Sequence, residues 1–485
     1  MPIRPMVQGA NEGSARPSSE IVIGLDIGTS SVKGAAYTLE GQLLRSASRP
    51  LDVSRPRPGW AEQDPEQWWR EVQAVLLTLG PARSVAVAGQ ANGVVLVDEH
   101  GQPTRPAIIW QDNRQASGGT GAVAAGQVAA SRFRWLESHE PDALEAACWW
   151  LQPKDFINLR LTGAVASDPN TSVGLSQGRA YRDDLPDGLR KRLPPLSRET
   201  DVLGTVHRAS VAVGCMDSVA SVCGSGPIEP GLAFDVSGTS ETVGLVSSQS
   251  THSGAIRQSI PLSVGRYLHA GPTQAGGAAA LWAQRIMAPE DDLDRLFELV
   301  STTKASNDPI VFLPYLLGER APIWDPRARG VFFGLHGEHR REDIFRAVLE
   351  GVAFSIRHVL ESIEEAVPER ADRVVCSGGA ARDEGWTQIK ADVIGRPVER
   401  ASWHAGTLGA AMVAACSVGA FGNLAEASRA MVRPGTRIEP HGGAARERYD
   451  ALYRIYLELV RTLPDTWQML AAVPRDHDRL AVGKQ

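Results

Sequence analysis

The chain has 485 residues, of which 43% are hydrophobic and 22% are charged. This length predicts two or three domains, and the composition excludes a chain that is disordered throughout. The formal net charge is −6, so the chain lacks the basic excess that would neutralise a nucleic-acid backbone. We therefore expect no nucleic-acid partner.

The cysteine and histidine patterns argue against disulfides and structural zinc. The five cysteines form no Cys-x-x-Cys pair, and the histidines form no His-Glu-x-x-His motif. We expect buried, reduced thiols in a cytoplasmic protein. Residues 1–20 are polar and lack the apolar core of a signal peptide, so we expect a disordered tail there. Residues 407–421 are too short for a membrane span and predict a buried helix, so no membrane association is expected.

The first structured segment predicts a β-meander. Residues 21–27 form a buried strand that ends in Gly28-Thr29-Ser30, and strands are expected again over 32–39 and 42–46. A related phrase returns at residues 232–240, where an apolar strand again precedes Gly-Thr-Ser. This repeat predicts two similar halves, 21–228 and 229–465, separated near residues 227–231, with a polar C-terminal tail over 466–485.

Helices are expected between these strands, which makes the fold class α/β. Asp64 and Pro65 predict a helix start, and regular apolar spacing predicts a long helix from about 342 to before Pro368. Residues 373–376 predict a strand, followed by a Gly-Gly turn and a helix containing Trp386. Residues 449–463 predict the last helix.

The segment from Asp26 to Lys33 is the first candidate site. Glycine allows close backbone approach to a phosphate, hydroxyls and amides can hold its oxygens, and Asp26 could bind Mg²⁺ through water. The same residues are typical of an ordinary turn after a buried strand. The repeat at Gly238-Thr239-Ser240 favours phosphate binding, because two such loops facing each other could hold a polyphosphate.

Asp217 follows a short strand and begins a helix rich in small residues. Aspartate is a favoured helix N-cap, and from the residues alone this interpretation is preferred. The alternative is a general base at the carboxyl end of a strand, where α/β folds bind ligands.

Three further segments carry weaker signals. The turn over residues 377–380 could admit an adenosine against bare backbone. Trp110, Asp112 and Arg114 could bind a hydroxylated substrate, or could form a surface Asp–Arg pair beside a packed tryptophan. Residues 90–93 suit a turn built on Asn92 and Gly93, which is the preferred interpretation of that segment.

Taken in order, these segments resemble the FGGY family of carbohydrate kinases, most closely its xylulose kinase branch. The phrases that carry the resemblance are residues 24–30, residues 58–65, Trp110-x-Asp112-x-Arg114, Pro153-Lys154-Asp155, residues 314–322 and the long phrase over residues 330–350. They span nearly the whole chain, and the last phrase is the most specific.

The resemblance implies two ribonuclease H-like domains of the actin/hexokinase type, with the active site in the cleft between them. It implies ATP and Mg²⁺ as cofactors, a small sugar as substrate, and a homodimer as a possible assembly. Asp217 matches the catalytic base, Asp26 matches the carboxylate near the metal, and both become metal-binding candidates. The implied nucleotide-binding residues are Gly28, Thr29, Ser30, Ser31, Lys33, Gly238, Thr239, Gly277, Gly378, Gly379, Ala380 and Asp383. The implied substrate-binding residues are Gln90, Ala91, Asn92, Trp110, Asp112 and Asp217.

The chain departs from the xylulose kinase pattern at two sugar-side positions. That branch usually has Gln-Met-His-Gly where this chain has Gln90-Ala91-Asn92-Gly93, and commonly Gln or Asn where it has Ser218. Because both positions would contact the sugar, D-xylulose is only the leading candidate substrate. The alternatives are another ketose, such as ribulose, and a polyol or acid of the erythritol, glycerol or gluconate type. The rival from another class is a degenerate sugar- and ATP-binding sensor, against which Asp26 and Asp217 argue.

Overall fold

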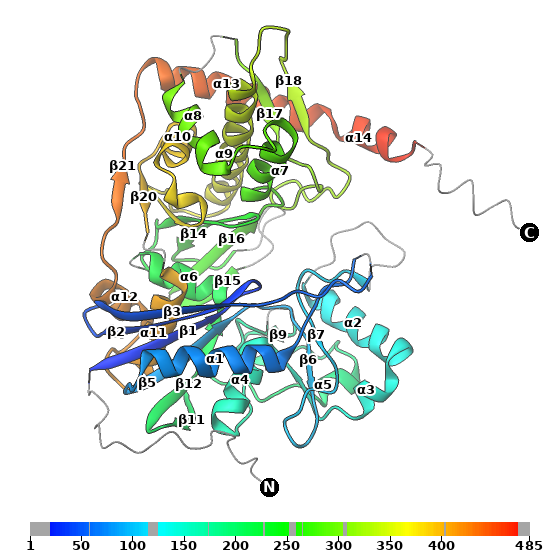
Figure 1. Ribbon diagram of the computed structural model, residues 1–485, viewed down its shortest axis with the longest axis vertical. Helices are drawn as coiled ribbons and strands as arrows, with labels where there is room; N and C mark the ends of the chain where they lie inside the picture. Colours follow the sequence, from blue (N-terminus) through cyan, green and yellow to red (C-terminus); the bar gives the residue numbers. More distant parts are fainter. Residues whose placement is uncertain are drawn as a thin grey trace, which may run out of the picture.

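The computed structural model describes residues 20–473 except 58, 115–124, 173, 227, 252–258, 264, 304–307, 402–403. The predicted N-terminal tail, apart from residue 20, lies outside this range. The described chain forms two lobes, each built on one large twisted sheet (Figure 1). None of the helices in the described ranges has both the length and the apolar character needed to cross a membrane.

The first sheet has six strands and contains the predicted meander. In spatial order the strands are β11 (Val202–Val206), β12 (Ala209–Met216), β5 (Ser84–Gly89), β1 (Ile21–Ile27), β2 (Ser31–Thr38) and β3 (Leu43–Pro50). Strands β1, β2 and β3 are antiparallel neighbours, whereas β5 runs parallel to both β1 and β12. The parallel strands bring their carboxyl ends, and hence the residues after them, to one edge of the sheet.

The second sheet has seven strands. In spatial order they are β15 (Ser259–Ser263), β16 (Arg266–Pro272), β14 (Glu241–Ser247), β13 (Ala233–Ser237), β19 (Val374–Gly378), β20 (Val398–Arg400) and β21 (Thr436–Ile438). Strand β13 pairs antiparallel with β14 and parallel with β19, just as β1 pairs with β2 and β5. Both sheets therefore share one strand order, with β15 as an additional edge strand, which agrees with the two similar halves expected from the Gly-Thr-Ser repeat.

The remaining elements cover and connect the sheets. In the first lobe they are β4 (Glu62–Gln63), α1 (Pro65–Leu79), β6 (Val95–Val97), β7 (Ala107–Ile108), α2 (Ala125–His139), α3 (Pro141–Glu145), β8 (Trp149–Leu151), α4 (Pro153–Thr162), β9 (Ser176–Gln177), β10 (Ala180–Tyr181), α5 (Asp187–Arg190) and α6 (Asp217–Ser225). In the rest of the chain they are α7 (Gly277–Met287), α8 (Leu293–Thr302), β17 (Val311–Leu313), β18 (Val331–Phe333), α9 (Arg341–Ala366), η2 (Ala380–Arg382), α10 (Glu384–Ile394), α11 (Ala405–Ser417), α12 (Leu424–Met431), α13 (Ala444–Thr462) and α14 (Pro464–Ala471).

Helix α11 belongs to the second half of the sequence but packs on the first sheet, beside β1 (Figure 1). A Cβ atom added at Gly24 in β1 would lie 1.9 Å from the carbonyl oxygen of Thr407, and one at Gly409 would lie 1.8 Å from that of Ala220 in α6. Only glycine permits these approaches. The predicted boundary near residues 227–231 thus falls between the strands of the two sheets, whereas α11 crosses it.

Several local predictions are confirmed. Asp64 caps α1 by accepting a hydrogen bond from the Glu66 amide, Pro65 is the first helical residue, and the long α9 ends before Pro368. The segment expected to be a buried helix is α11.

Two predictions need correction. The helix expected to be the last, over residues 449–463, is α13, and helix α14 follows it, so the expected polar tail is helical up to Ala471 and its Trp467 is buried against the Tyr315 ring. A short helix anchored by one aromatic residue leaves little periodic signal. The cysteines are free, but they are not all buried, because Cys148 is exposed and Cys416 is partly exposed.

Candidate active site

Asp217 lies at the carboxyl end of β12, as the first residue of helix α6. The helix N-cap is Met216, and Asp217 Oδ1 accepts a hydrogen bond from the next amide, Ser218 N, at 2.7 Å. The N-cap interpretation that the residues favoured is therefore wrong. The carboxylate is left at the edge of the sheet, close to a second acid.

That second acid is Asp26, near the end of β1. Burial and the negative charge of Asp26 raise the pKa of Asp217 to about 7, although the Ser218 hydrogen bond opposes the shift. Burial also raises the pKa of Asp26, which Lys33 on the paired strand β2 partly lowers. Two neighbouring carboxylates with raised pKa values form a site that can accept a proton or hold a cation.

The N-terminus of α11 closes this site from the other half of the chain. A Cβ at Gly406 would lie 2.7 Å from Asp26 Oδ2 and 3.4 Å from Ser221 Oγ, so a side chain there would displace the carboxylate. Asp26 Oδ1 is buried and has no hydrogen-bond partner among the described residues. An unpartnered buried oxygen of this kind is a suitable ligand for a hydrated divalent cation.

The first Gly-Thr-Ser loop is connected to the predicted sugar side through Thr29. Trp110 Nε1 donates a hydrogen bond to Thr29 Oγ1 at 2.9 Å, and Thr29 Oγ1 donates to Gln90 Oε1 at 3.4 Å. Gln63 completes the group, because its Nε2 donates to the Thr29 carbonyl at 2.8 Å and its Oε1 accepts from Gln90 Nε2 at 2.9 Å. Phosphate-side and sugar-side candidates therefore form one hydrogen-bonded unit.

The nucleotide-side candidates gather at the carboxyl ends of β13 and β19. Gly277 N, at the start of α7, donates to the Gly238 carbonyl at 2.9 Å, and Ala278 N donates to that of Thr239 at 3.1 Å. Gly379 N donates to the Ser237 carbonyl at 3.0 Å, and the matching bond in the first sheet runs from Gln90 N to Ile27 O, also at 3.0 Å. The second Gly-Thr-Ser loop, the start of α7 and the Gly-Gly turn thus lie together.

Two family models match the chain. Residues 21–224 match the N-terminal domain of the FGGY family of carbohydrate kinases, and residues 234–418 match its C-terminal domain. The chain belongs to the FGGY family of carbohydrate kinases. It is accordingly an enzyme with the two-domain actin/hexokinase-like fold, and it uses ATP with a metal ion.

Relatives of several specificities resemble this kinase. A xylulose kinase from Klebsiella pneumoniae is 32% identical over 437 residues, which cover 82% of this chain and 90% of that protein. A gluconokinase from Bacillus subtilis (strain 168) is 25% identical over 506 residues, covering 94% and 98%. The crystal structure of xylulose kinase from Rhodospirillum rubrum has 31% identity and a TM-score of 0.81, covering 92% of this chain and 100% of that one.

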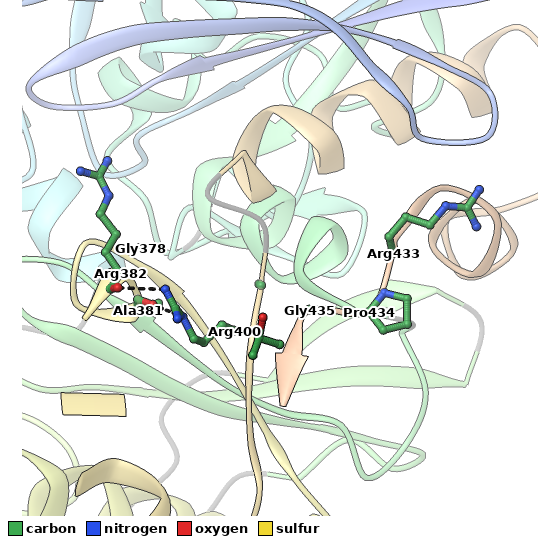
Figure 2. A pocket seen from close by; sticks show the side chains of 9 residues that line it. Gly378, Ala381, Arg382, Arg400, Arg433, Pro434 and Gly435 are labelled. Carbon is green, nitrogen blue, oxygen red and sulfur yellow. Dashed lines mark hydrogen bonds between the residues drawn. The ribbon is translucent and has the colours of Figure 1, made fainter. Parts of the chain in front are cut away.

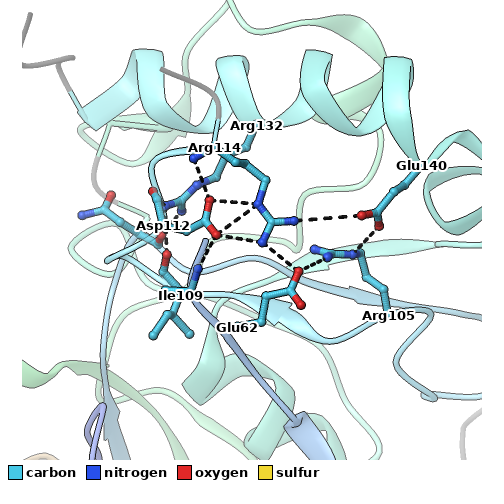
Figure 3. Close-up of polar contacts among 9 residues, drawn as sticks. Glu62, Arg105, Ile109, Asp112, Arg114, Arg132 and Glu140 are labelled. Carbon is cyan, nitrogen blue, oxygen red and sulfur yellow. Dashed lines mark hydrogen bonds and ion pairs between the residues drawn. The ribbon is translucent and has the colours of Figure 1, made fainter. Parts of the chain in front are cut away.

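Asp112 of the kinase lies in a buried polar network (Figure 3). Its Oδ2 accepts a hydrogen bond from Ala61 N at 2.6 Å, and both of its carboxylate oxygens accept from Arg114 Nε. The Arg114 guanidinium also contacts Glu62 and lies 3.7 Å from the centre of the Trp60 ring. The alternative of a surface Asp–Arg pair beside a packed tryptophan is wrong, because the pair is buried and Trp110 is 41% exposed.

Arg400, which was not predicted, holds the short helix η2 that follows the Gly-Gly turn of the kinase. Arg400 Nε donates to the Ala381 carbonyl at 2.7 Å and Nη2 to that of Arg382 at 2.8 Å (Figure 2). A cavity of about 410 Å³ adjoins this turn and is lined by Gly378, Ala381, Arg382, Arg400, Ala401 and residues 433–436. Asp383 caps α10 by accepting a hydrogen bond from the Trp386 amide, so part of its acceptor capacity is structural.

Arg320 and Glu319 are further unpredicted residues at the nucleotide side. Arg320 Nη2 donates to Ser240 Oγ at 3.3 Å, and Nε donates to the Thr273 carbonyl at 3.2 Å. Glu319 Oε1 accepts from Gln274 N at 2.6 Å, and burial raises the pKa of Glu319 to about 7. The two side chains tie the second Gly-Thr-Ser loop to the segment before α7. Their presence in the family phrase at residues 314–322 was the available signal.

Below the second loop lies a buried ionic cluster. Lys390 Nζ, on α10, lies 2.5 Å from Asp235 Oδ2, 2.6 Å from Ser237 Oγ and 3.7 Å from Glu241 Oε1. Burial and the charge of Asp235 raise the pKa of Glu241 well above its usual range. The cluster holds the ends of β13 and β14 together, beneath the loop that joins them.

Proposed function

We propose that the kinase transfers the γ-phosphoryl group of ATP to a hydroxyl of a ketose, with D-xylulose as the leading substrate and Asp217 as the general base. The observation that carries the proposal is the Asp26–Asp217 pair, in which burial and like charge bring the pKa of Asp217 to about 7. A base with a pKa near the working pH combines availability with proton affinity. The xylulose kinases among the relatives support the choice of sugar.

The donor set fits Mg-ATP. Mg²⁺ is usually held by one or two carboxylates, several waters and the phosphates of the substrate. Asp26, whose Oδ1 has no hydrogen-bond partner among the described residues, is suited to orient the waters bound to Mg²⁺, and Asp217 lies close by. No group of three or more acidic, histidine or cysteine side chains in the described ranges could hold a metal alone. Bound Mg-ATP supplies the phosphoryl group and neutralises charge on the phosphates.

The chain's own residues would position the reactants and move one proton. Asp217 accepts the proton of the attacking sugar hydroxyl. Backbone amides and hydroxyls of the two Gly-Thr-Ser loops hold phosphate oxygens, and Lys33 adds positive charge beside Asp26. Trp110, supported by Thr29, forms a wall for the sugar. Phosphoryl transfer depends mainly on such positioning and charge stabilisation.

The proposed substrate class is the ketoses, with D-xylulose as its leading member. Asn92 and Ala91 replace the His and Met of the usual xylulose kinase phrase, and Ser218 follows the base. Asparagine keeps a donor and an acceptor but reaches less far than histidine. A different ketose, or a polyol or sugar acid, therefore competes with D-xylulose as the best substrate.

Sugar-dependent release of ADP tests the proposal. A panel of pentuloses, hexuloses, polyols and gluconate should reveal at least one good substrate, with D-xylulose expected to give the highest kcat/KM. Asp217→Asn should lower kcat for that sugar by about a hundredfold or more while leaving ADP affinity within about twofold. Asp372→Asn, an exposed site, serves as the matched control.

Normal turnover by Asp217→Asn would exclude it as the base. A panel without any ADP release, from a protein that binds ATP and sugar, would favour the sensor alternative.

A further inference from the structure

Arg132, in the middle of α2, is almost completely buried, with 2% of its surface exposed. Its guanidinium donates hydrogen bonds to three backbone carbonyls, of which those of Ile109 and Asp112 belong to residues labelled in Figure 3. Nη2 reaches Ile109 O at 2.9 Å and Asp112 O at 3.0 Å, and Nη1 donates to Asn92 O. One side chain therefore contacts two segments that are distant in the sequence.

Both segments carry the predicted sugar-binding residues. Asn92 lies in the turn over residues 90–93 and has a φ of 58°, a left-handed conformation that a non-glycine residue adopts only with support. Gln152 Oε1 accepts a hydrogen bond from the next amide, Gly93 N, at 3.1 Å. In the second segment, Arg132 donates to the carbonyls of Ile109 and Asp112, which precede and follow the exposed Trp110 in the sequence.

The burial of this cation has a physical cost that its contacts must offset. Burial lowers the pKa of Arg132 to about 10, despite the opposing charge of Asp112, so the side chain stays protonated at neutral pH. Charge-assisted hydrogen bonds to carbonyls are stronger than neutral ones and compensate for lost hydration. The planar guanidinium can point several donors in set directions at once, whereas an ammonium group cannot match that geometry.

We propose that Arg132 is a positioning residue that sets the relative placement of the Asn92 turn and the Trp110 segment, and thereby helps to determine which sugars fit. The inference rests on the proposed function, since it assumes that these two segments face the sugar. Arg132 itself lies behind the carbonyls and is not a catalytic residue. A displacement of about 1 Å between two binding segments is enough to change catalytic efficiency by up to about a hundredfold.

The test compares Arg132→Lys and Arg132→Met with wild type across the same panel of pentuloses, hexuloses, polyols and gluconate. We expect KM for the preferred sugar to rise about tenfold or more in both variants, and the ratio of kcat/KM between the two best sugars to change by about tenfold. KM for ATP should stay within about twofold. Arg134→Met, an exposed residue on the same helix, should leave all these values unchanged.

Chemical rescue separates positioning from general structural support. Guanidinium ion at millimolar concentration should partly restore sugar KM in Arg132→Ala and should have no such effect on Arg134→Ala. Unchanged sugar selectivity in Arg132→Lys would overturn the inference, even if Arg132→Met failed to fold. An equal loss for every sugar, with a matching rise in KM for ATP, would also overturn it, because this is the result expected of a structural defect.

The wild-type measurement distinguishes this inference from the proposed function. Absence of sugar-dependent turnover in wild type would overturn the proposed function and the inference together. Turnover in wild type with unaltered selectivity in the variants would overturn the inference alone.

Discussion

The two sheets share a strand order, but their equivalent strands place acidic residues on opposite faces. In the first sheet Ile27 pairs with Gly89, and in the second Ser237 pairs with Gly378, so these positions correspond. Asp26 then corresponds to Val236. The acid of the second strand, Asp235, corresponds to the buried Leu25.

This one-residue difference decides what each acid does. Side chains alternate between the faces of a strand, so a shift of one position moves a carboxylate to the other face. Asp26 faces the side on which α11 packs and lies near Asp217. Asp235 faces the core of its own lobe, where Lys390 neutralises it. Related folds can therefore place similar residues in a reactive site or in a structural ion cluster.

Removal of Lys390 should have the largest effect on stability. Lys390→Met leaves Asp235 without its buried countercharge, and loss of one partner from a buried ion pair costs about 3–5 kcal/mol. Urea unfolding should show a decrease of that size, compared with little change for the exposed Lys191→Met. Equal stability of the two variants would contradict a structural role for the second sheet's acids.

The same change at Asp26 and Asp235 should separate activity from stability. Asp26→Asn should reduce kcat by about a hundredfold. It should cost little unfolding free energy, because the raised pKa of Asp26 means that the folded protein disfavours the negative charge which the substitution removes. Asp235→Asn should lower the unfolding free energy while folded protein keeps most of its turnover. Coupled ADP-release kinetics and urea unfolding measure both quantities, and similar profiles for the two variants would break the comparison.

Arg320 should affect the nucleotide half selectively. Arg320→Gln removes a cation that donates to Ser240 and to the Thr273 carbonyl, so we expect KM for ATP to rise about tenfold while KM for the sugar changes less than about twofold. Arg327→Gln, a more exposed arginine paired with Asp325 in the same segment, is the matched control. A rise in KM for the sugar instead would assign Arg320 to the other half.

The pH dependence should report the Asp26–Asp217 pair. Asp217 must be ionised to accept a proton, so kcat/KM should rise through about pH 7 and fall about tenfold per unit below it. Asp26→Asn should move this limb to lower pH. Burial raises the pKa of Asp217 in the folded protein above its value in the unfolded chain, so folding disfavours the ionised carboxylate. As the pH rises from about 4 to about 7, the free energy of unfolding of the wild type should therefore fall, relative to that of Asp217→Asn, by up to about 1.4 kcal/mol per pH unit. A constant stability difference across that range would contradict the raised pKa.

Substitution of Thr29 should have the smallest effect on the kinetic constants. Thr29→Val removes the acceptor for Trp110 Nε1 and the donor to Gln90, which is expected to raise KM for the sugar about fivefold. The exposed Thr78→Val is the control. A change in KM for ATP alone would mean that Thr29 serves only the phosphate side.

Much of the fold could be predicted from local patterns, whereas Asp26 and Asp217 were assigned their roles only by the family resemblance. Apolar alternation, the Asp64–Pro65 helix start and the repeated Gly-Thr-Ser turns depend on neighbouring residues, and the order of the motifs identified Asp26 and Asp217. The supporting side chains could not be predicted in this way. Arg132, Arg400 and Lys390 act on segments that are remote in the sequence, and no local pattern predicts such a partner, whereas Arg320 at least lay within the family phrase over residues 314–322.

The sequence by itself therefore determined the α/β class, the likeness of the two halves and, through the order of its motifs, membership of the carbohydrate kinase family. Only the tertiary structure decided that Asp217 is the first residue of α6 and not its N-cap, that Asp112 is buried and paired with Arg114, and that α11 crosses to the first sheet beside Asp26. The physical reason is that burial, pKa and backbone support depend on which segments pack together, and local residue patterns do not contain that information.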